Sequence, residues 1–292
     1  MLNFVLVQER VKFLTTGITG VSRGLKIEPD AEIGQKRGLF KGLKILLYIF
    51  LITLAGIVFN LSSSIHAGES SLPFPIGEKL KYNVRWETVK AGKASFRILD
   101  LATINGEKAN HFILEIESNK YIDLFFKIRD RHEGFTKLDF TQSILYKKRQ
   151  TGKDKRDAKI LFDWDKKTAA YSNFGEKSNP IEIPLNTFDP LSAFYKMRTL
   201  QFNTGQSLSF PVTNGKKYFI QQASVIKKET ITIASGTYDT YQIDLAVKNF
   251  SGVFKKSKKP TVKIWVTADE RKVPVRIKVK VVIGSVIFDL DE

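Results

Sequence analysis

From residue 80 onward, apolar and polar side chains alternate one by one along the chain. The first such run reads LKYNVRWE over residues 80–87, with an apolar side chain at every second position. Successive side chains of a β-strand point to opposite faces of the sheet, so this alternation indicates a strand with one buried and one solvated face. An amphipathic helix would instead repeat its apolar positions every 3.6 residues or about that. The pattern therefore restricts this part of the chain to β-structure.

Runs of strand length recur through the rest of the chain, separated by short turns. They lie near residues 94–99, 111–117, 126–135, 142–151, 157–164, 168–174, 181–184, 208–212, 218–226, 230–234, 241–247, 262–267, 273–279 and 281–289. Asn105-Gly106 between two runs is a strong hairpin signal, because both residues tolerate positive φ. Turns this short join antiparallel neighbours. We predict an all-β fold, one antiparallel meander that forms a strongly curved sheet or an open barrel.

The sequence DPLSAFYKMRTL over residues 189–200 interrupts the β-pattern. Asp189 suits the N-cap of a helix and Pro190 suits its first position. Leu191, Phe194 and Tyr195 follow at helical spacing. We predict a single short helix here.

The longest apolar run, ILLYIFLITLAGIVF over residues 45–59, precedes the β-region. Four cations stand before it, Lys36, Arg37, Lys41 and Lys44, and a polar segment follows. As a helix, residues 45–61 would be about 25 Å long, between a signal-peptide core and a full membrane span. Two interpretations stay open: an anchor in the inner membrane, or a signal peptide cleaved near Ala67. Both place the N-terminus inside and the β-region outside the cytoplasm.

These features divide the chain into four parts. Residues 1–44 are an N-terminal tail, either cytoplasmic or produced by a start assigned too early. Residues 45–61 are the transmembrane anchor or signal-peptide core. Residues 62–79 form a linker rich in serine and proline. Residues 80–292 form the β-rich domain, which we expect to be exported to the periplasm.

The composition restricts the kinds of chemistry and of binding partner that are open to the chain. The chain has no cysteine and a formal net charge of +17. The lack of cysteine excludes disulfides and cysteine nucleophiles. The positive charge indicates an anionic partner or serves solubility. For an exported protein, that partner is a membrane, an anionic lipid or a glycan, and nucleic acid is excluded. Four lysines of one loop are either solvated or contact such anions: Lys255, Lys256, Lys258 and Lys259.

Residues 130–133, DRHE, form the densest cluster of ionisable groups. In a strand, Asp130 and His132 face one side, whereas Arg131 and Glu133 face the other. No nucleophile motif such as G-x-S-x-G accompanies them. The histidines lack metal-binding spacing and no phosphate-binding loop is present. We therefore expect a solvated or salt-bridged strand face rather than a catalytic site, with no metal and no cofactor.

The aromatic residues allow two interpretations. In the first, they fill the core of one curved sheet. In the second, the sheet forms an open barrel whose mouth holds an acyl chain or another apolar ligand. The residues expected to bind such a ligand are Trp86, Phe125, Phe126, Phe194 and Tyr195, with Arg129 and Arg131 on an anionic head.

Several segments carry a family resemblance. They read LPFPIGEKLKYNVRWETVKAGKASFRI, KIRDRHEGF, FDPLSAFYKMRTL, GQSLSFPVTNGKKY and IWVTADERKVPVRIKVKVVIGSVIFDL. In this order they resemble a widespread family of exported bacterial proteins known as a domain of unknown function, over about residues 72–290. The resemblance implies a signal peptide and one β-rich domain of this size. It implies no activity, ligand or catalytic residue.

Three functions follow as hypotheses. The first is non-enzymatic binding of a lipid or lipid-linked glycan on the periplasmic side of the cell envelope. The alternative is an envelope assembly or structural protein that binds other proteins through edge strands or an apolar patch. The third is a glycan-directed enzyme that uses Glu133 or Asp130.

Overall fold

The computed structural model describes residues 72, 74–125, 127–151, 155–246, 261–280 and 284–291. The predicted tail, the apolar segment 45–61 and most of the linker lie outside these residues. Phe126 and the lysines Lys255, Lys256, Lys258 and Lys259 also lie outside them. Within the described ranges, no helix is both long and apolar enough to cross a membrane.

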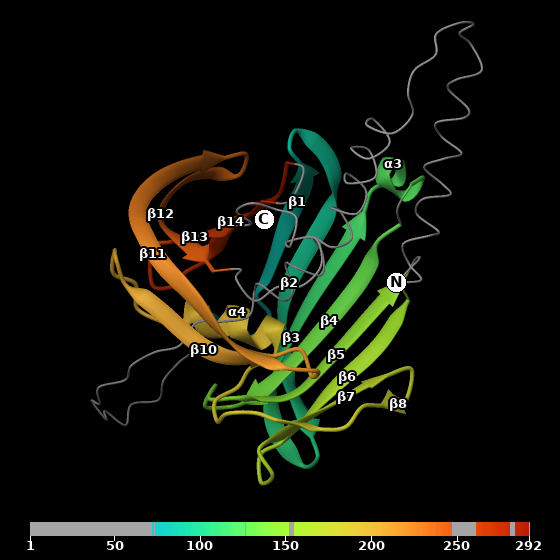
Figure 1. Ribbon diagram of the computed structural model, residues 1–292. Helices are drawn as coiled ribbons and strands as arrows, with labels where there is room; N and C mark the ends of the chain where they lie inside the picture. The colour runs from blue at the N-terminus through green and yellow to red at the C-terminus, as the bar shows by residue number, and fades with distance from the viewer. Residues whose placement is uncertain are drawn as a thin grey trace, which may run out of the picture.

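The described residues form one antiparallel sheet of fifteen strands (Figure 1). Eight strands come before the irregular segment at residues 178–180: β1 (Lys79–Trp86), β2 (Val89–Ile104), β3 (Glu107–Ser118), β4 (Arg129–Lys137), β5 (Ser143–Thr151), β6 (Arg156–Asp163), β7 (Thr168–Asn173) and β8 (Glu176–Lys177). Seven follow it: β9 (Ile181–Glu182), β10 (Ser207–Thr213), β11 (Tyr218–Ile233), β12 (Gly236–Leu245), β13 (Val262–Thr267), β14 (Pro274–Lys280) and β15 (Ser285–Leu290).

The order of the strands in the sheet joins two meanders through the first and last strands. From one edge to the other it runs from β10 to β15, then from β1 to β8, and β9 pairs with β7. The junction is the antiparallel pairing of β1 with β15, in which Tyr82 lies opposite Leu290. The sheet curls around one face but is not closed, because its path ends at β10 and at β8. The predicted all-β fold with an open antiparallel sheet is thereby confirmed, but the single meander expected from the sequence is two meanders joined by β1 and β15.

One turn and one bulge show how the local sequence determines the strands. Asn105 and Gly106 have φ of 50° and 87°, and Ile104 pairs with Glu107 across them, as a tight hairpin requires. Strand β11 is continuous where the sequence predicts two strands. Its register shifts between Val225 and Lys227, so a bulge at this point breaks the alternation without ending the strand.

The predicted helix at residues 189–200 is α4 (Pro190–Arg198). The Asp189 side chain accepts hydrogen bonds from the backbone N–H groups of Leu191 and Ser192, as an N-cap does. The helix lies inside the curve of the sheet and contacts β3, β4 and β10 (Figure 1). Gly134 of β4 permits this approach, because a Cβ there would lie 2.8 Å from Ser192 Oγ.

A second helix, α3 (Lys120–Asp123), corrects the expectation of a single helix. Asn119 caps it by accepting hydrogen bonds from the N–H groups of Tyr121 and Ile122. One turn is too short for an apolar period to appear in the sequence.

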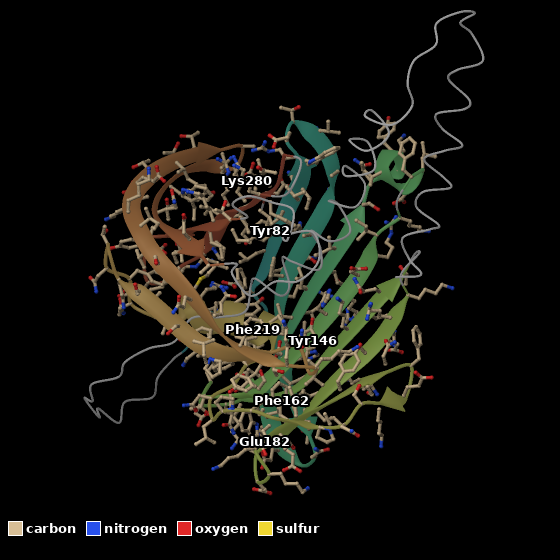
Figure 2. All side chains as sticks on the ribbon, viewed as in Figure 1. Tyr82, Tyr146, Phe162, Glu182, Phe219 and Lys280 are labelled. Carbon is tan, nitrogen blue, oxygen red and sulfur yellow. The ribbon has the colours of Figure 1, made fainter. Side chains whose placement is uncertain are left out.

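Aromatic side chains fill the space around α4. Phe194 stacks on Phe96 with ring centroids 4.7 Å apart, and Tyr195 stacks on Phe112 at 4.2 Å. Phe74 meets Tyr195 edge to face at 5.5 Å. Figure 2 shows further rings within the curve of the sheet, those of Tyr82, Tyr146 and Phe219, which are all buried.

The predicted linker contributes to this core. Phe74 is buried, and the buried carboxylate of Glu78 binds Arg198 at the end of α4 through two contacts of 2.5 and 2.9 Å. The Arg198 guanidinium also donates to the backbone carbonyls of Arg271 and Lys272. Phe74 and Glu78 therefore pack with the β-domain, although the sequence analysis placed them in a linker that ends at residue 79.

Candidate functional site on the concave face

A pocket lies at the end of the concave face that α3 covers. The space that the centres of water-sized molecules can occupy is about 30 Å³, and the unfilled space is about 420 Å³ when the part that opens to solvent is included. Its walls come from α3 and from strands β1, β2, β3, β14 and β15, and the side chains are mainly apolar. They include Val84, Ala91, Ile116, Ile122, Val286 and Phe288. We refer to this space as the end pocket. An apolar cavity with polar groups at its border is the usual form of a site for an apolar ligand.

Helix α3 is fixed beside the end pocket by hydrogen bonds at its start. The backbone N–H of Asn119 donates to the carbonyl of Ala91 at 2.9 Å, and its side-chain amide donates to the carbonyl of Lys90 at 2.6 Å. The Ser118 hydroxyl donates to Asp123 and accepts from the backbone N–H of Ile128. These bonds hold the β1–β2 turn and α3 together, with Ile122 lining the pocket.

Four polar side chains lie next to the end pocket on the inner face of β4 and β5. They are Asp130, His132, Lys148 and Gln150, all buried, and we call them the polar wall. Asp130 lies directly opposite Ile116, which lines the pocket. Opposite residues of neighbouring strands share a face, so the apolar and polar surfaces are continuous.

Two atoms of the polar wall have unused hydrogen-bonding capacity. Gln150 donates to Asp130 Oδ2 at 2.6 Å, and His132 Nδ1 lies 2.6 Å from the Tyr146 hydroxyl. Yet His132 Nε2 and Gln150 Oε1 are buried and have no partner among the described residues. Leaving buried polar atoms unpaired costs roughly 1–3 kcal/mol each. A polar group of a ligand would satisfy them.

Burial also changes the charges of the polar wall. It lowers the pKa of His132 well below its ordinary value, so the imidazole is neutral at pH 7. Burial lowers the pKa of Lys148 to about 7, an effect that the Asp130 carboxylate opposes. The wall therefore offers hydrogen-bond donors and acceptors and one cation that loses its proton easily.

The structure separates the aromatic residues that the sequence placed in one site. Trp86 lies opposite Val286, so it borders the end pocket. Phe194 and Tyr195 are core residues at α4. Phe125 follows α3 and is largely exposed. The first interpretation, that aromatic residues fill the core, describes the region around α4.

Arg129 and Arg131, which the sequence analysis placed on the anionic head of a ligand, do not share the concave face. Alternation along β4 turns them away from the buried side of Asp130 and His132. Arg129 pairs with Asp123 at 2.7 Å. Arg131 pairs with Glu115 at 2.6 Å and Glu133 at 2.9 Å.

These convex-face pairs form a ladder across three strands. Arg97 binds the other oxygen of Glu115 at 2.8 Å, and His111 lies 3.1 Å from Glu133. The salt-bridged strand expected for Arg131 and Glu133 is thus present on this face. Asp130 and His132, in contrast, belong to the polar wall. Alternation in the sequence already separated these two pairs, but it could not say which pair is buried.

The same geometry bears on a glycosidase-like mechanism. Asp130 and Glu133 lie on opposite faces of β4, so they cannot flank one glycosidic bond as a pair of catalytic carboxylates does. In the described part of the chain, no group of three or more His, Asp or Glu side chains is placed to hold a metal ion.

An open antiparallel sheet curved around an internal helix places the described domain in the all-β class of proteins. The chain belongs to the family described as "Protein of unknown function (DUF3108)", whose model matches residues 81–291. The resemblance to an all-β domain-of-unknown-function family is thereby confirmed.

Two solved structures that align with this chain come from bacteria. A β-barrel-like protein of the domain of unknown function DUF1849 from Brucella abortus is 7% identical, with a TM-score of 0.49 over 74% of this chain and 96% of that chain. A hypothetical protein from Chlamydia trachomatis is 10% identical, with a TM-score of 0.31 over 74% of this chain and 85% of that chain. No curated protein matches the chain.

Proposed function

We propose that the protein is a non-enzymatic component of the cell envelope that binds a lipid or a lipid-linked glycan on the periplasmic side. The acyl chain lies in the end pocket, and the polar head lies along the polar wall. One observation carries this proposal: the apolar pocket and the polar wall with its unpaired atoms are neighbours on one face of the sheet, where Ile116 of the pocket pairs with Asp130 of the wall.

The energetics favour an amphiphile over a purely polar ligand. Each methylene transferred from water into the end pocket contributes about 0.8 kcal/mol. A polar head gains only when it pairs with groups such as His132 Nε2 and Gln150 Oε1, which are desolvated before it arrives. An amphiphile uses both surfaces, whereas a free sugar would leave the apolar one empty.

The location follows from the sequence. The apolar segment 45–61 and its preceding cations direct the β-domain across the inner membrane. The net charge of +17 then favours an anionic lipid or glycan among the molecules of that compartment.

Native mass spectrometry tests the proposal. Residues 68–292 are expressed with an export signal and purified without detergent, and then offered phospholipid or lipopolysaccharide. We expect a bound lipid of defined mass, retained on purification or taken up from the mixture. A clean apo mass with no uptake would overturn the proposal and favour the alternative role in envelope assembly.

A matched pair of variants locates the ligand. Ala91→Leu adds three carbon atoms inside the end pocket and is expected to abolish lipid uptake. Ala102→Leu makes the same change beside the small outer cluster of Phe135 and Leu145, away from the pocket, and should leave uptake unchanged. Thermal melting checks that both variants are folded. Equal uptake by the two variants would show that the lipid binds elsewhere.

A further inference from the structure

The outer side of α3 and the adjoining β1–β2 turn expose large apolar side chains. The exposed fractions are 65% for Tyr121, 70% for Leu124, 43% for Phe125 and 55% for Val89. Scattered exposed apolar residues are ordinary, but here three lie within five consecutive positions and the fourth is beside them. The bond from Asn119 to the Lys90 carbonyl holds the two segments together. We call these four residues the α3 edge.

Lysines surround the α3 edge. Lys90, Lys120 and Lys127 are exposed, and Lys120 Nζ lies 5.2 Å from the centroid of the Tyr121 ring. Three carboxylates are near, those of Glu87, Glu117 and Asp123. Asp123 is neutralised by Arg129 at 2.7 Å. The surroundings of the α3 edge are therefore net positive.

We infer that the α3 edge docks on an anionic lipid bilayer. Its apolar side chains would enter the interface between headgroups and acyl chains, and the lysines would contact lipid phosphates. The charge selects this occupant over a second copy of the chain, because pairing two α3 edges would bring like-charged lysines together. Helix α3 lies at one end of the sheet, away from the strands that enclose α4 (Figure 1). The α3 edge would therefore contact a flat bilayer without a rearrangement of the sheet.

The position of α3 connects docking to the end pocket. Ile122 lines the pocket, while Tyr121 and Leu124 face away from the domain. One helical turn therefore separates the docked bilayer from the pocket, which makes α3 the entry point for an acyl chain. This entry route rests on the proposed function, whereas docking itself does not.

The absence of cysteine from the sequence permits a clean labelling experiment. Leu124→Cys is labelled with the environment-sensitive probe NBD in the full chain. The labelled protein is reconstituted into vesicles of phosphatidylcholine with or without phosphatidylglycerol. We expect blue-shifted emission and quenching by nitroxide-labelled lipids in the anionic vesicles, and much weaker effects in phosphatidylcholine.

Leu161→Cys is the matched control. Leu161 is 51% exposed on β6, next to Leu145, at the other end of the convex face. Its label should show no blue shift in either vesicle. Identical responses at the two positions, or no response at position 124, would overturn the inference.

Charge reversal and the pocket variant separate docking from lipid binding. Lys120→Glu and Lys127→Glu should each weaken docking about fivefold or more, since a lysine near an anionic surface contributes about 1 kcal/mol. Lys177→Glu, on the distant strand β8, should have little effect. Ala91→Leu should dock normally while losing lipid uptake. If the unsubstituted protein takes up lipid but does not dock, only the docking inference fails, and if it docks but takes up no lipid, only the proposed function fails.

Discussion

The two ends of the concave face are built from the same alternating strands but covered by very different helices. At one end α4, nine residues long, has every residue buried except Lys196. At the other end α3, four residues long, has no buried residue. Around α4 the rings of Phe74, Phe96 and Phe112 leave little space. Beside α3 lie the end pocket and the polar wall.

The difference shows that the alternation of apolar and polar residues determines which side chains face the concave side. It does not determine whether a helix then covers those side chains. The α4 end supplies the stability that a domain without disulfides requires from its core. The α3 end keeps an open apolar pocket and buried polar atoms without partners, which cost stability and suit binding. Substitutions at the α4 end should therefore lower the free energy of unfolding, whereas substitutions at the α3 end should mainly weaken lipid uptake.

The largest effect is expected at the ion pair of Glu78 with Arg198. Glu78→Ala leaves a buried guanidinium without its carboxylate, which should lower the free energy of unfolding by about 3–5 kcal/mol. Urea denaturation measures this. The double variant Glu78→Leu with Arg198→Met should recover much of the loss. A loss below about 1 kcal/mol for Glu78→Ala would mean that the pair is solvated.

Phe194→Ala should cost about 3–5 kcal/mol, because it removes a stacked, buried ring and leaves a cavity. Ile122→Ala, at the half-buried side of α3, should cost about 1 kcal/mol but weaken lipid binding. Denaturation and lipid uptake are measured on both variants. Equal stability losses would contradict the division of roles between the two ends.

At the α4 end, Asp189 should make the free energy of unfolding depend on pH. Burial raises the pKa of its carboxyl to about 6, although four hydrogen bonds oppose this. Between about pH 4 and 6 the folded state then binds more protons than the unfolded state, so stability falls as the pH rises. Asp189→Asn should flatten this slope while still capping the helix. Urea midpoints across this window provide the check, and an unchanged slope would contradict it.

Lys148 gives the opposite slope at the α3 end. Its folded pKa of about 7 lies below the unfolded value, so the unfolded state binds more protons between about pH 7 and 10. Stability should rise with pH in this window, and Lys148→Met should remove the rise. The same denaturation series, extended to alkaline pH, measures it. A wild-type slope that persists in the variant would assign the effect to another group.

The smallest change in the free energy of unfolding is expected for a substitution on the convex face. Arg131→Ala removes half-exposed contacts with Glu115 and Glu133 and should cost less than about 1 kcal/mol. Lipid uptake should not change, because the side chain points away from the polar wall. A defect in uptake would return Arg131 to the binding site that the sequence suggested.

The sequence predicted the features of the fold that are determined by residues close together in the chain. Alternation located most strands, Asn105-Gly106 located a hairpin, and Asp189-Pro190 located α4. Pairings between distant segments could not be predicted. The β1–β15 junction depends on two strands with no shared turn, and the burial of Phe74 depends on rings contributed by β3 and α4.

The candidate site was predicted only in part, for the same reason. The split of residues 130–133 between two faces follows from alternation, and the structure shows it. The polar wall needs the register between β4 and β5, which brings His132 opposite Lys148. A polar residue at every second position of both strands was the available signal. Without the register, it could not be distinguished from a solvated face.

The pairing of β1 with β15 also sets the timing of folding. β1 pairs with β15, so the sheet cannot be completed until residues 285–290 have been synthesised. Chains dominated by such distant contacts fold slowly. During that interval β1 presents an unpaired edge that invites incorrect association. Because β15 joins the two meanders, a truncation that removes β15 would leave two separate partial sheets and not one shortened sheet.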